Sequence, residues 1–292
     1  MEVIDILKNK KGFIAALDQS GGSSKKTLAN YGITNINSDD EMFECIHKMR
    51  KRVITANCFD ERIIGVILFK HTMENKIDDR YTAKYLLDEK NIVSFLKIDV
   101  GLEDTSDGVQ LLKDIPGLDG VLENAKEYGV IGTKMRSVIH EYNEYGIKKL
   151  VEQQFKLAKI IISHGLIPII EPEVSIDAVN KKQIESYLRN EVIKNLVKMK
   201  KEDYVIFKFT LPEVSNYYND LLRYKNVLRI VALSGGYKRD LACQKLKENK
   251  KMIASFSRAL LEGLNINQSD EEFASVLDST ISEIYDASVN KK

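Results

Sequence analysis

The stretch Tyr204–Thr210, "YVIFKFT", has the pattern of a buried β-strand interrupted by one lysine, Lys208. Side chains alternate between the two faces of a strand. Val205, Phe207 and Phe209 therefore form one apolar face, and Lys208 lies on the opposite face. Because an ammonium group is a poor core residue, Lys208 either reaches a wet edge or is kept inside for a chemical reason.

Seven further short apolar runs recur along the chain, separated by polar segments with helical periodicity. The runs span residues 12–18, 63–69, 92–99, 130–136, 165–174, 227–235 and 251–260. An example of the intervening helices is predicted over residues 147–163. Strands alternating with helices indicate parallel strands with helical crossovers. Eight such units in 292 residues predict an α/β fold, a (β/α)8 TIM barrel, formed by residues 1–292 as one domain. An open doubly wound sheet is the alternative, less favoured because no GxGxxG fingerprint follows the first run.

Composition narrows the class of partner and site. Lysine plus arginine (44) nearly equals aspartate plus glutamate (43). The net charge of +1 predicts no general attraction to nucleic acid or to a membrane. The three cysteines are scattered and odd in number, which fits a reducing cytoplasm. The four histidines are far apart and no metal-binding motif is present, so no metal is predicted. Neither a signal peptide nor a membrane span is expected, because no long apolar run is present.

Ionisable residues occur near the carboxyl ends of the middle strands, at equal intervals along the chain. These residues are Lys97, Lys134, Glu171 and Lys208. Asp18 ends the first strand in the same way, and alternation places Arg136 and Glu173 on the faces of Lys134 and Glu171. Active sites of barrels lie at the carboxyl ends of the strands, so these charges are predicted to converge in the barrel mouth. A purely structural ion network is the alternative.

Two loops of small polar residues follow predicted strands. Ser234, Gly235 and Gly236 lie in "LSGGYKR", and Ser20 and Ser23 lie in "DQSGGS". Backbone N–H groups and hydroxyls in such loops can bind phosphate. Arg258 would add positive charge to the first loop, and Lys97 could serve the second. Two anion sites predict a bisphosphate substrate or two phosphorylated products.

Six segments occur in the order of a known family: "KGFIAALDQSGGS", "GTKMRS", "PIIEPEV", "LSGGY", "ASFSRAL" and "YDASVN". Through them nearly the whole chain resembles a class I fructose-1,6-bisphosphate aldolase of the compact bacterial form. The resemblance implies a cytoplasmic, metal-independent lyase of glycolysis and gluconeogenesis. It would cleave fructose 1,6-bisphosphate reversibly to dihydroxyacetone phosphate and glyceraldehyde 3-phosphate. It would use a covalent lysine imine and no cofactor, and its partners would be sugar phosphates. The animal relatives form tetramers, but no exposed apolar run of this chain can be assigned to an interface, so a homo-oligomer stays an open alternative.

The resemblance also implies a role for each matching residue. Lys208 matches the Schiff-base lysine, Glu171 the acid/base glutamate, and Glu173 its partner in the lysine and glutamate cluster. Lys134, Arg136 and Asp18 match groups that polarise or orient the substrate. Lys97, Ser20 and Ser23 resemble one phosphate site, and Ser234, Gly235, Gly236 and Arg258 resemble the other.

Three departures from the animal enzymes leave questions open. Gln19 replaces an acidic residue, Met135 replaces a tryptophan, and the long tail ending in tyrosine is missing. The group that protonates the carbanion is therefore open, with Tyr285 as one candidate. The same imine chemistry could serve tagatose bisphosphate or sedoheptulose bisphosphate. A phosphosugar-binding barrel without catalysis is the non-enzyme alternative.

Overall fold

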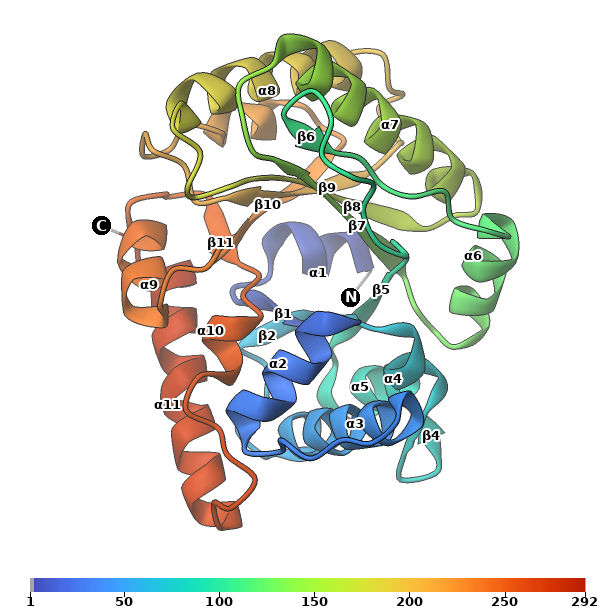
Figure 1. Ribbon diagram of the computed structural model, residues 1–292, viewed down its shortest axis with the longest axis vertical. Helices are drawn as coiled ribbons and strands as arrows, with labels where there is room; N and C mark the ends of the chain where they lie inside the picture. Colours follow the sequence, from blue (N-terminus) through green and yellow to red (C-terminus); the bar gives the residue numbers. More distant parts are fainter. Residues whose placement is uncertain (1–2, 292) are drawn as a thin grey trace.

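The computed structural model describes residues 3–291, in which eight parallel strands form a nearly closed barrel surrounded by helices (Figure 1). Around the barrel the strands are β1 (Phe13–Leu17), β2 (Ile63–Leu68), β5 (Val93–Lys97), β7 (Gly132–Ile139), β8 (Ile167–Val174), β9 (Val205–Thr210), β10 (Val227–Leu233) and β11 (Met252–Ala254). Ala16 N on β1 donates to Phe256 O, just beyond β11, at 3.2 Å and joins the two ends of the sheet. The predicted (β/α)8 barrel is confirmed.

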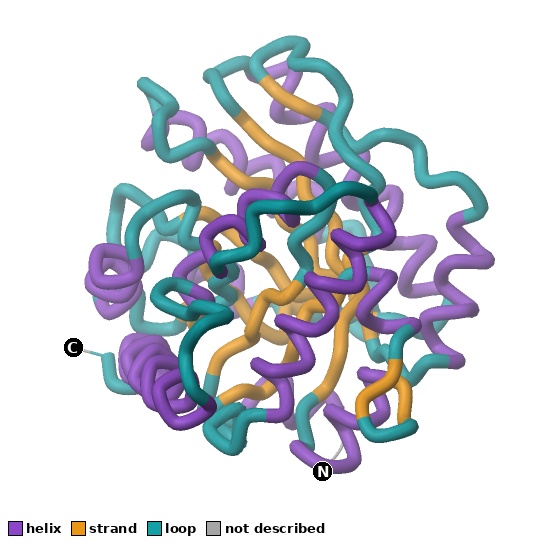
Figure 2. The backbone as a smooth tube through the Cα atoms, turned by 60° about the horizontal axis from the view of Figure 1, so that its bottom comes forward, coloured by secondary structure: helices purple, strands orange, loops and turns teal. Residues whose placement is uncertain are grey.

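Helices occupy the intervals between the strands and surround them in Figure 2. They are α1 (Val3–Asn9), α2 (Gly22–Tyr31), α3 (Asp39–Thr55), α4 (Lys70–Glu74), α5 (Thr82–Lys90), α6 (Leu118–Glu127), α7 (Glu144–Ser163), α8 (Lys181–Leu196), α9 (Arg239–Lys247), α10 (Arg258–Leu261) and α11 (Asp270–Val289), with a 3-10 turn at Asn219–Arg223. The start of α11 has a capping box, in which the Ser269 hydroxyl accepts from Glu272 N. None of the helices among residues 3–291 is long and apolar enough to cross a membrane.

Three short strands lie outside the eight-stranded path. β3 (Lys76–Ile77) and β4 (Arg80–Tyr81) form an antiparallel hairpin, and β6 (Val109–Gln110) pairs antiparallel with the end of β7. β7 pairs on both sides up to Ile139, three residues beyond the predicted run 130–136. The predicted run 251–260 is longer than the strand it contains, because β11 ends at Ala254 and Arg258 begins α10.

Strand alternation divides the hydrophobic residues into two cores. Val205, Phe207 and Phe209 of β9 belong to the outer core, which packs the strands against the helices. Ile206 of the same strand belongs to the inner core that fills the barrel, together with residues such as Ile169. The two faces predicted for Tyr204–Thr210 are therefore confirmed.

The amino-terminal end of the barrel is closed by α1, which is visible through the barrel in Figure 1. Ile6 and Leu7 of this helix are buried in the inner core. Arg229 on β10 fixes the end of α1, since its Nε donates to Leu7 O at 2.7 Å and its Nη2 to Lys10 O at 3.1 Å. We refer to this end, formed by α1 and the first residues of the strands, as the barrel floor.

Gly132 shows how tightly the inner core is packed. A Cβ atom at this inward position of β7 would lie 2.2 Å from Ile167 O and 2.7 Å from Phe95 Cδ1. Only glycine leaves room for the Phe95 ring and for close pairing with β8. Two residues further along β7, the same face carries Lys134 at the other end of the barrel.

Candidate active site

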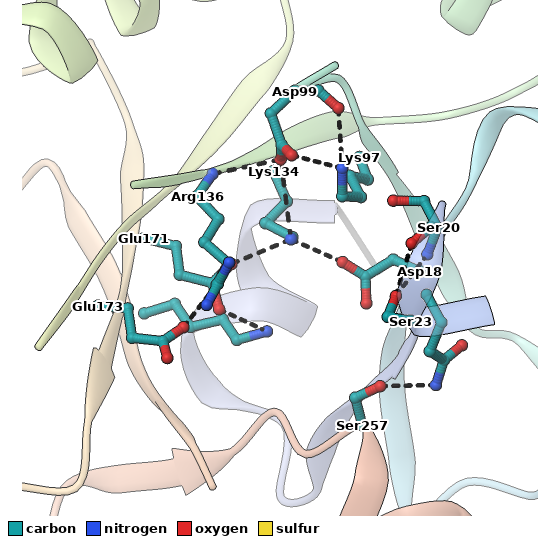
Figure 3. Close-up of polar contacts among 12 residues, drawn as sticks. Asp18, Ser20, Ser23, Lys97, Asp99, Lys134, Arg136, Glu171, Glu173 and Ser257 are labelled. Carbon is teal, nitrogen blue, oxygen red and sulfur yellow. Dashed lines mark hydrogen bonds and ion pairs between the residues drawn. The ribbon is translucent and has the colours of Figure 1, made fainter. Parts of the chain in front are cut away.

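Four of the predicted ionisable residues meet at the carboxyl ends of the strands. Lys134 Nζ lies 2.6 Å from Asp18 Oδ2 and 3.0 Å from Glu171 Oε2 (Figure 3). Lys208 Nζ lies 3.1 Å from Glu171 Oε1. All four residues are buried, with exposed fractions of 7% or less. The Glu171 carboxylate therefore bridges two ammonium groups that come from β7 and β9.

The charges fix one another's ionisation. Burial alone would raise the pKa of Asp18, but Lys134, Lys208 and Lys97 outweigh it and hold the pKa below its usual value. Burial also acts to raise the pKa of Glu171, yet Lys134 and Lys208 lower it overall. For Lys134 burial acts to lower the pKa, and the nearby carboxylates, Asp18 foremost, raise it well above its usual value. Each of these groups is consequently charged at neutral pH.

Asp99 is a member of the site to which the sequence assigned no role. Its carboxylate binds the Lys97 ammonium, which also donates to Asp99 O at 2.8 Å. Asp99 Oδ2 accepts from Arg136 N at 3.3 Å and lies 3.9 Å from Lys134 Nζ. The sequence contained a signal for this ion pair, because Lys97 and Asp99 are two residues apart and so lie on the same face of an extended chain. Lys97 was expected to serve the serine loop after β1, and this role stays a prediction; in the structure its ammonium group is paired with Asp99.

Glu173 also differs from its expected place among the lysines. Its Oε2 pairs with Arg136 Nε at 2.5 Å. Arg136 and Glu173 each lie two residues beyond Lys134 and Glu171 on their strands, which puts both one layer nearer the mouth. Glu171, rather than Glu173, is the carboxylate between the two ammonium groups.

The loop after β1 is a compact turn. Ser20 N donates to Ser23 Oγ at 2.9 Å, and Ser23 Oγ donates to Ser20 O at 2.7 Å. Gly21 has a φ of +53°, a conformation that favours glycine. Ser20 and Ser23 thus lie together where α2 begins, close to Asp18 in the chain.

The loop after β10 meets Arg258, as the sequence predicted. Tyr237 N donates to Ser234 O at 2.9 Å, and both glycines of this turn have positive φ, +61° at Gly235 and +113° at Gly236. A Cβ atom on Gly236 would lie 3.4 Å from Arg258 Nη2. The guanidinium of Arg258 therefore lies beside a tight turn whose residues include the buried Ser234.

The other residues singled out in the sequence lie away from these charges. Tyr285 is on α11 and packs against the outer core, and Met135 is fully buried in that core on the outward face of β7. Gln154 lies on α7, within the helix predicted over residues 147–163, and reaches the site from outside the barrel: it donates to Glu171 O at 3.1 Å and to Ser137 Oγ at 3.0 Å. It fixes the backbone at Glu171 from the helix layer.

Metal ligands are not grouped in the part of the chain that the structure describes. Across residues 3–291, no three histidine, cysteine, aspartate or glutamate side chains are arranged so that they could hold an ion. The cluster instead alternates cations with carboxylates. It can hold an anionic ligand, transfer protons, and offer a lysine amine to a carbonyl group.

Comparison with known proteins gives one family and two similar structures. The model of the family described as fructose-bisphosphate aldolase class-I matches residues 2–217. The fructose-bisphosphate aldolase from Plasmodium falciparum, solved with TRAP and a small-molecule inhibitor, is 21% identical, with 99% of this chain and 93% of that chain covered and a TM-score of 0.76. A protein from Corynebacterium glutamicum is 15% identical over 98% of this chain and 91% of its own, with a TM-score of 0.57. The structural matches show the same barrel fold, and the family match spans most of the chain.

Proposed function

The chain belongs to the class I fructose-bisphosphate aldolase family, and from this premise we propose that it cleaves fructose 1,6-bisphosphate reversibly to dihydroxyacetone phosphate and glyceraldehyde 3-phosphate. Class I aldolases are carbon–carbon lyases. The observation that carries the choice of catalytic residues is the contact of Lys208 Nζ with Glu171 Oε1 at 3.1 Å inside the barrel mouth. A buried lysine beside a buried carboxylate supports imine chemistry with proton transfer at the same place.

Lys208 is the proposed nucleophile. Its amine adds to the C2 carbonyl of the sugar, and loss of water from the carbinolamine gives a protonated imine. As the C3–C4 bond breaks, its electron pair moves toward this imine and forms an enamine. Protonation at C3 and hydrolysis of the imine then release dihydroxyacetone phosphate and restore the amine. The imine is the electron sink, so the chemistry calls for no metal and no cofactor.

Glu171 is the proposed acid and base. Cleavage requires that the C4 hydroxyl lose its proton, and carbinolamine dehydration requires that a proton be delivered. Lys134 and Lys208 keep Glu171 ionised, which is the form a base must have. Lys134 Nζ and Asp18 Oδ2 lie 2.6 Å apart beside Glu171, and we assign these two groups to orienting and polarising the substrate. The ion pair of Arg136 and Glu173 lies next to them.

The two loops are the proposed phosphate sites. The imine forms at C2, so the C1 phosphate lies close to Lys208 on β9. The loop after β10 is the neighbour of that strand, and there Ser234, Gly235, Gly236 and Arg258 come together. The C6 phosphate, four carbons beyond the imine carbon C2, is assigned to the loop with Ser20 and Ser23, together with Lys97 at the end of β5, two strands along the barrel from β1.

The wider proposal is a cytoplasmic enzyme whose residues 1–292 form one domain and whose partners are sugar phosphates, neither nucleic acid nor membranes. Copies of the chain could associate as the animal relatives do. Tagatose bisphosphate and sedoheptulose bisphosphate are the alternative substrates, and binding without turnover is the alternative function. Choosing among the sugars depends on hydrogen bonds to single hydroxyl groups.

Steady-state kinetics test this proposal. We expect cleavage of fructose 1,6-bisphosphate with a higher kcat/KM than of tagatose 1,6-bisphosphate or sedoheptulose 1,7-bisphosphate, and we expect EDTA to leave the rate unchanged. A higher kcat/KM with another ketose bisphosphate would transfer the assignment to that sugar. Tight binding of all three sugars without cleavage would support the non-catalytic alternative.

A further inference from the structure

Arg50 differs from the lysines of the barrel mouth because it is buried without a carboxylate partner. It lies on α3 and is fully buried. Lys134 and Lys208 each lie within about 3 Å of a carboxylate oxygen, whereas no aspartate or glutamate among residues 3–291 lies within ion-pair distance of Arg50. Its Nε has no hydrogen-bond partner among those residues. A buried charge without a partner is costly, so its presence calls for a reason.

The contacts of Arg50 are with the loop after β1 and with α4. Nη2 donates to Gln19 O at 2.6 Å and to Gln19 Oε1 at 3.1 Å, and Nη1 donates to Thr72 Oγ1 at 2.7 Å. A guanidinium has donors only, so the Gln19 amide must present its oxygen to Arg50 and turn its NH2 group away. One side chain therefore fixes both the backbone and the side chain of Gln19.

The NH2 group of Gln19 joins two loops of the mouth. It donates at 2.6 Å to the hydroxyl of Ser257, which precedes Arg258 in the loop after β11; Ser257 is labelled in Figure 3. Gln19 itself stands between Asp18 and Ser20 in the chain. Arg50 thus holds the β1 loop at Gln19 and, through the Gln19 amide, ties this loop to the neighbouring loop after β11.

Arg50 also contributes a charge that no neighbour cancels. Burial lowers its pKa to about 10, with Asp18 acting in the opposite direction, so the guanidinium is charged at neutral pH. Asp18 is itself paired with Lys134 at 2.6 Å. A positive charge directly behind the β1 loop favours an anion in front of it.

We infer that Arg50 is a positioning residue for the phosphate held by the β1 loop, and that it sets the preference for a sugar phosphorylated at the end far from the imine. This inference rests on the proposed function. Arg50 acts through Gln19 and through its charge, without touching the substrate. Removing it should weaken binding of the C6 phosphate and leave handling of a sugar that lacks this phosphate almost unchanged.

The test compares fructose 1,6-bisphosphate with fructose 1-phosphate in the full chain. In Arg50→Met we expect kcat/KM for the bisphosphate to fall about tenfold or more, mainly through KM, as for loss of hydrogen bonds to a charged group. The value for fructose 1-phosphate should change less than about twofold. Arg50→Lys should restore part of the ratio of kcat/KM for the bisphosphate to kcat/KM for fructose 1-phosphate. Lysine keeps the positive charge but lacks the planar guanidinium that bonds both Gln19 and Thr72.

Arg229→Met is the matched control. Arg229 is also an arginine that binds neutral oxygens, but it is only partly buried and lies at the barrel floor. Its replacement should lower the melting temperature and leave the ratio of the two kcat/KM values as in the wild type. If Arg50→Met fails to fold, Gln19→Met keeps the arginine and should lower the same ratio by a smaller factor.

Two results would overturn the inference: an unchanged ratio in the folded variants, or an equal loss of activity toward both sugars. The second would mean that Arg50 only stabilises the fold. A wild-type chain that cleaves neither sugar would overturn the proposed function itself, and the inference with it, before any variant is measured.

Discussion

The two ends of the barrel are lined by the same strands but by opposite chemistry. On β9 the inward residue changes from Ile206 to Lys208, and on β8 it changes from Ile169 to Glu171. At the floor, α1 closes an apolar interior; at the mouth, the same strand faces end in paired charges. One step of strand alternation thus separates residues that hold the barrel together from residues that are placed to react.

The difference predicts how each end responds to mutation. Apolar burial at the floor contributes stability in proportion to the area removed from water. Buried ion pairs contribute little net stability, because desolvation offsets their attraction, although removing one partner is costly. Floor variants should therefore lower stability with little change in the rate per folded molecule, whereas mouth variants should lower the rate of the molecules that remain folded.

Lys208→Met should give the largest effect. Without the amine no imine forms, and we expect kcat/KM to fall at least about 1000-fold, as for loss of other covalent nucleophiles. Glu171 keeps Lys134 as a partner at 3.0 Å, so the barrel should remain folded. Cleavage kinetics and circular dichroism of the same sample check both points. Substantial activity in the folded variant would contradict the assignment of Lys208.

Glu171→Gln should have the next largest effect. It removes the carboxylate that bridges two ammonium groups, and Lys208 then has no other carboxylate within ion-pair distance among the described residues. We expect kcat to fall about 100-fold or more and stability to fall by about 3 kcal/mol. Urea unfolding and kinetics give the two values. A stable variant with near-normal kcat would show that another group carries the proton.

Leu7→Ala is the floor counterpart. Leu7 is fully buried in the inner core. Its truncation should cost about 2 to 5 kcal/mol of unfolding free energy, and kcat should stay within about twofold of the wild type when the protein is folded. A large fall in kcat without loss of stability would mean that the two ends are not separable.

Acidification should give the smallest effect. The pKa of Asp18 is lower in the folded chain than its usual value of about 3.9, because the surrounding lysines outweigh burial. Asp18 therefore stabilises the fold above about pH 4, and this contribution is lost as the pH falls from about 4 toward the folded pKa. Asp18→Asn should reduce the loss of stability between pH 5 and 3 by about 1 kcal/mol, measured by urea unfolding. An equal loss of stability between pH 5 and 3 in the wild type and in Asp18→Asn would show that Asp18 does not cause the acid sensitivity.

Much of this contrast could be predicted from the sequence. Hydrophobic periodicity placed Val205, Phe207 and Phe209 against the helices, because a strand pattern fixes which side chains share a face. The rule that barrel strands end at one face brought Lys134, Glu171 and their neighbours together. The boundary of β11 was missed, because one apolar run, residues 251–260, contains the end of a strand and the start of a helix.

The pairing of individual side chains could not be predicted. Asp99 takes the Lys97 ammonium, and Arg136 takes Glu173, because the reach of each side chain in three dimensions decides the partner. Arg50 comes to Gln19 from a helix that is distant in the sequence, and helical periodicity shows only that this position faces inward. Contacts between elements depend on how helices pack on the barrel, which a single sequence does not specify.

The most direct test is borohydride reduction of the protein in the presence of dihydroxyacetone phosphate, followed by peptide mapping with mass spectrometry. Reduction should attach the triose phosphate to Lys208 alone, inactivate the enzyme, and leave Lys134 and Lys97 unmodified. Lys208→Met treated in the same way should gain no triose. No adduct on the active wild-type protein, or an adduct on another lysine, would contradict the assignment of Lys208 as the residue that forms the imine.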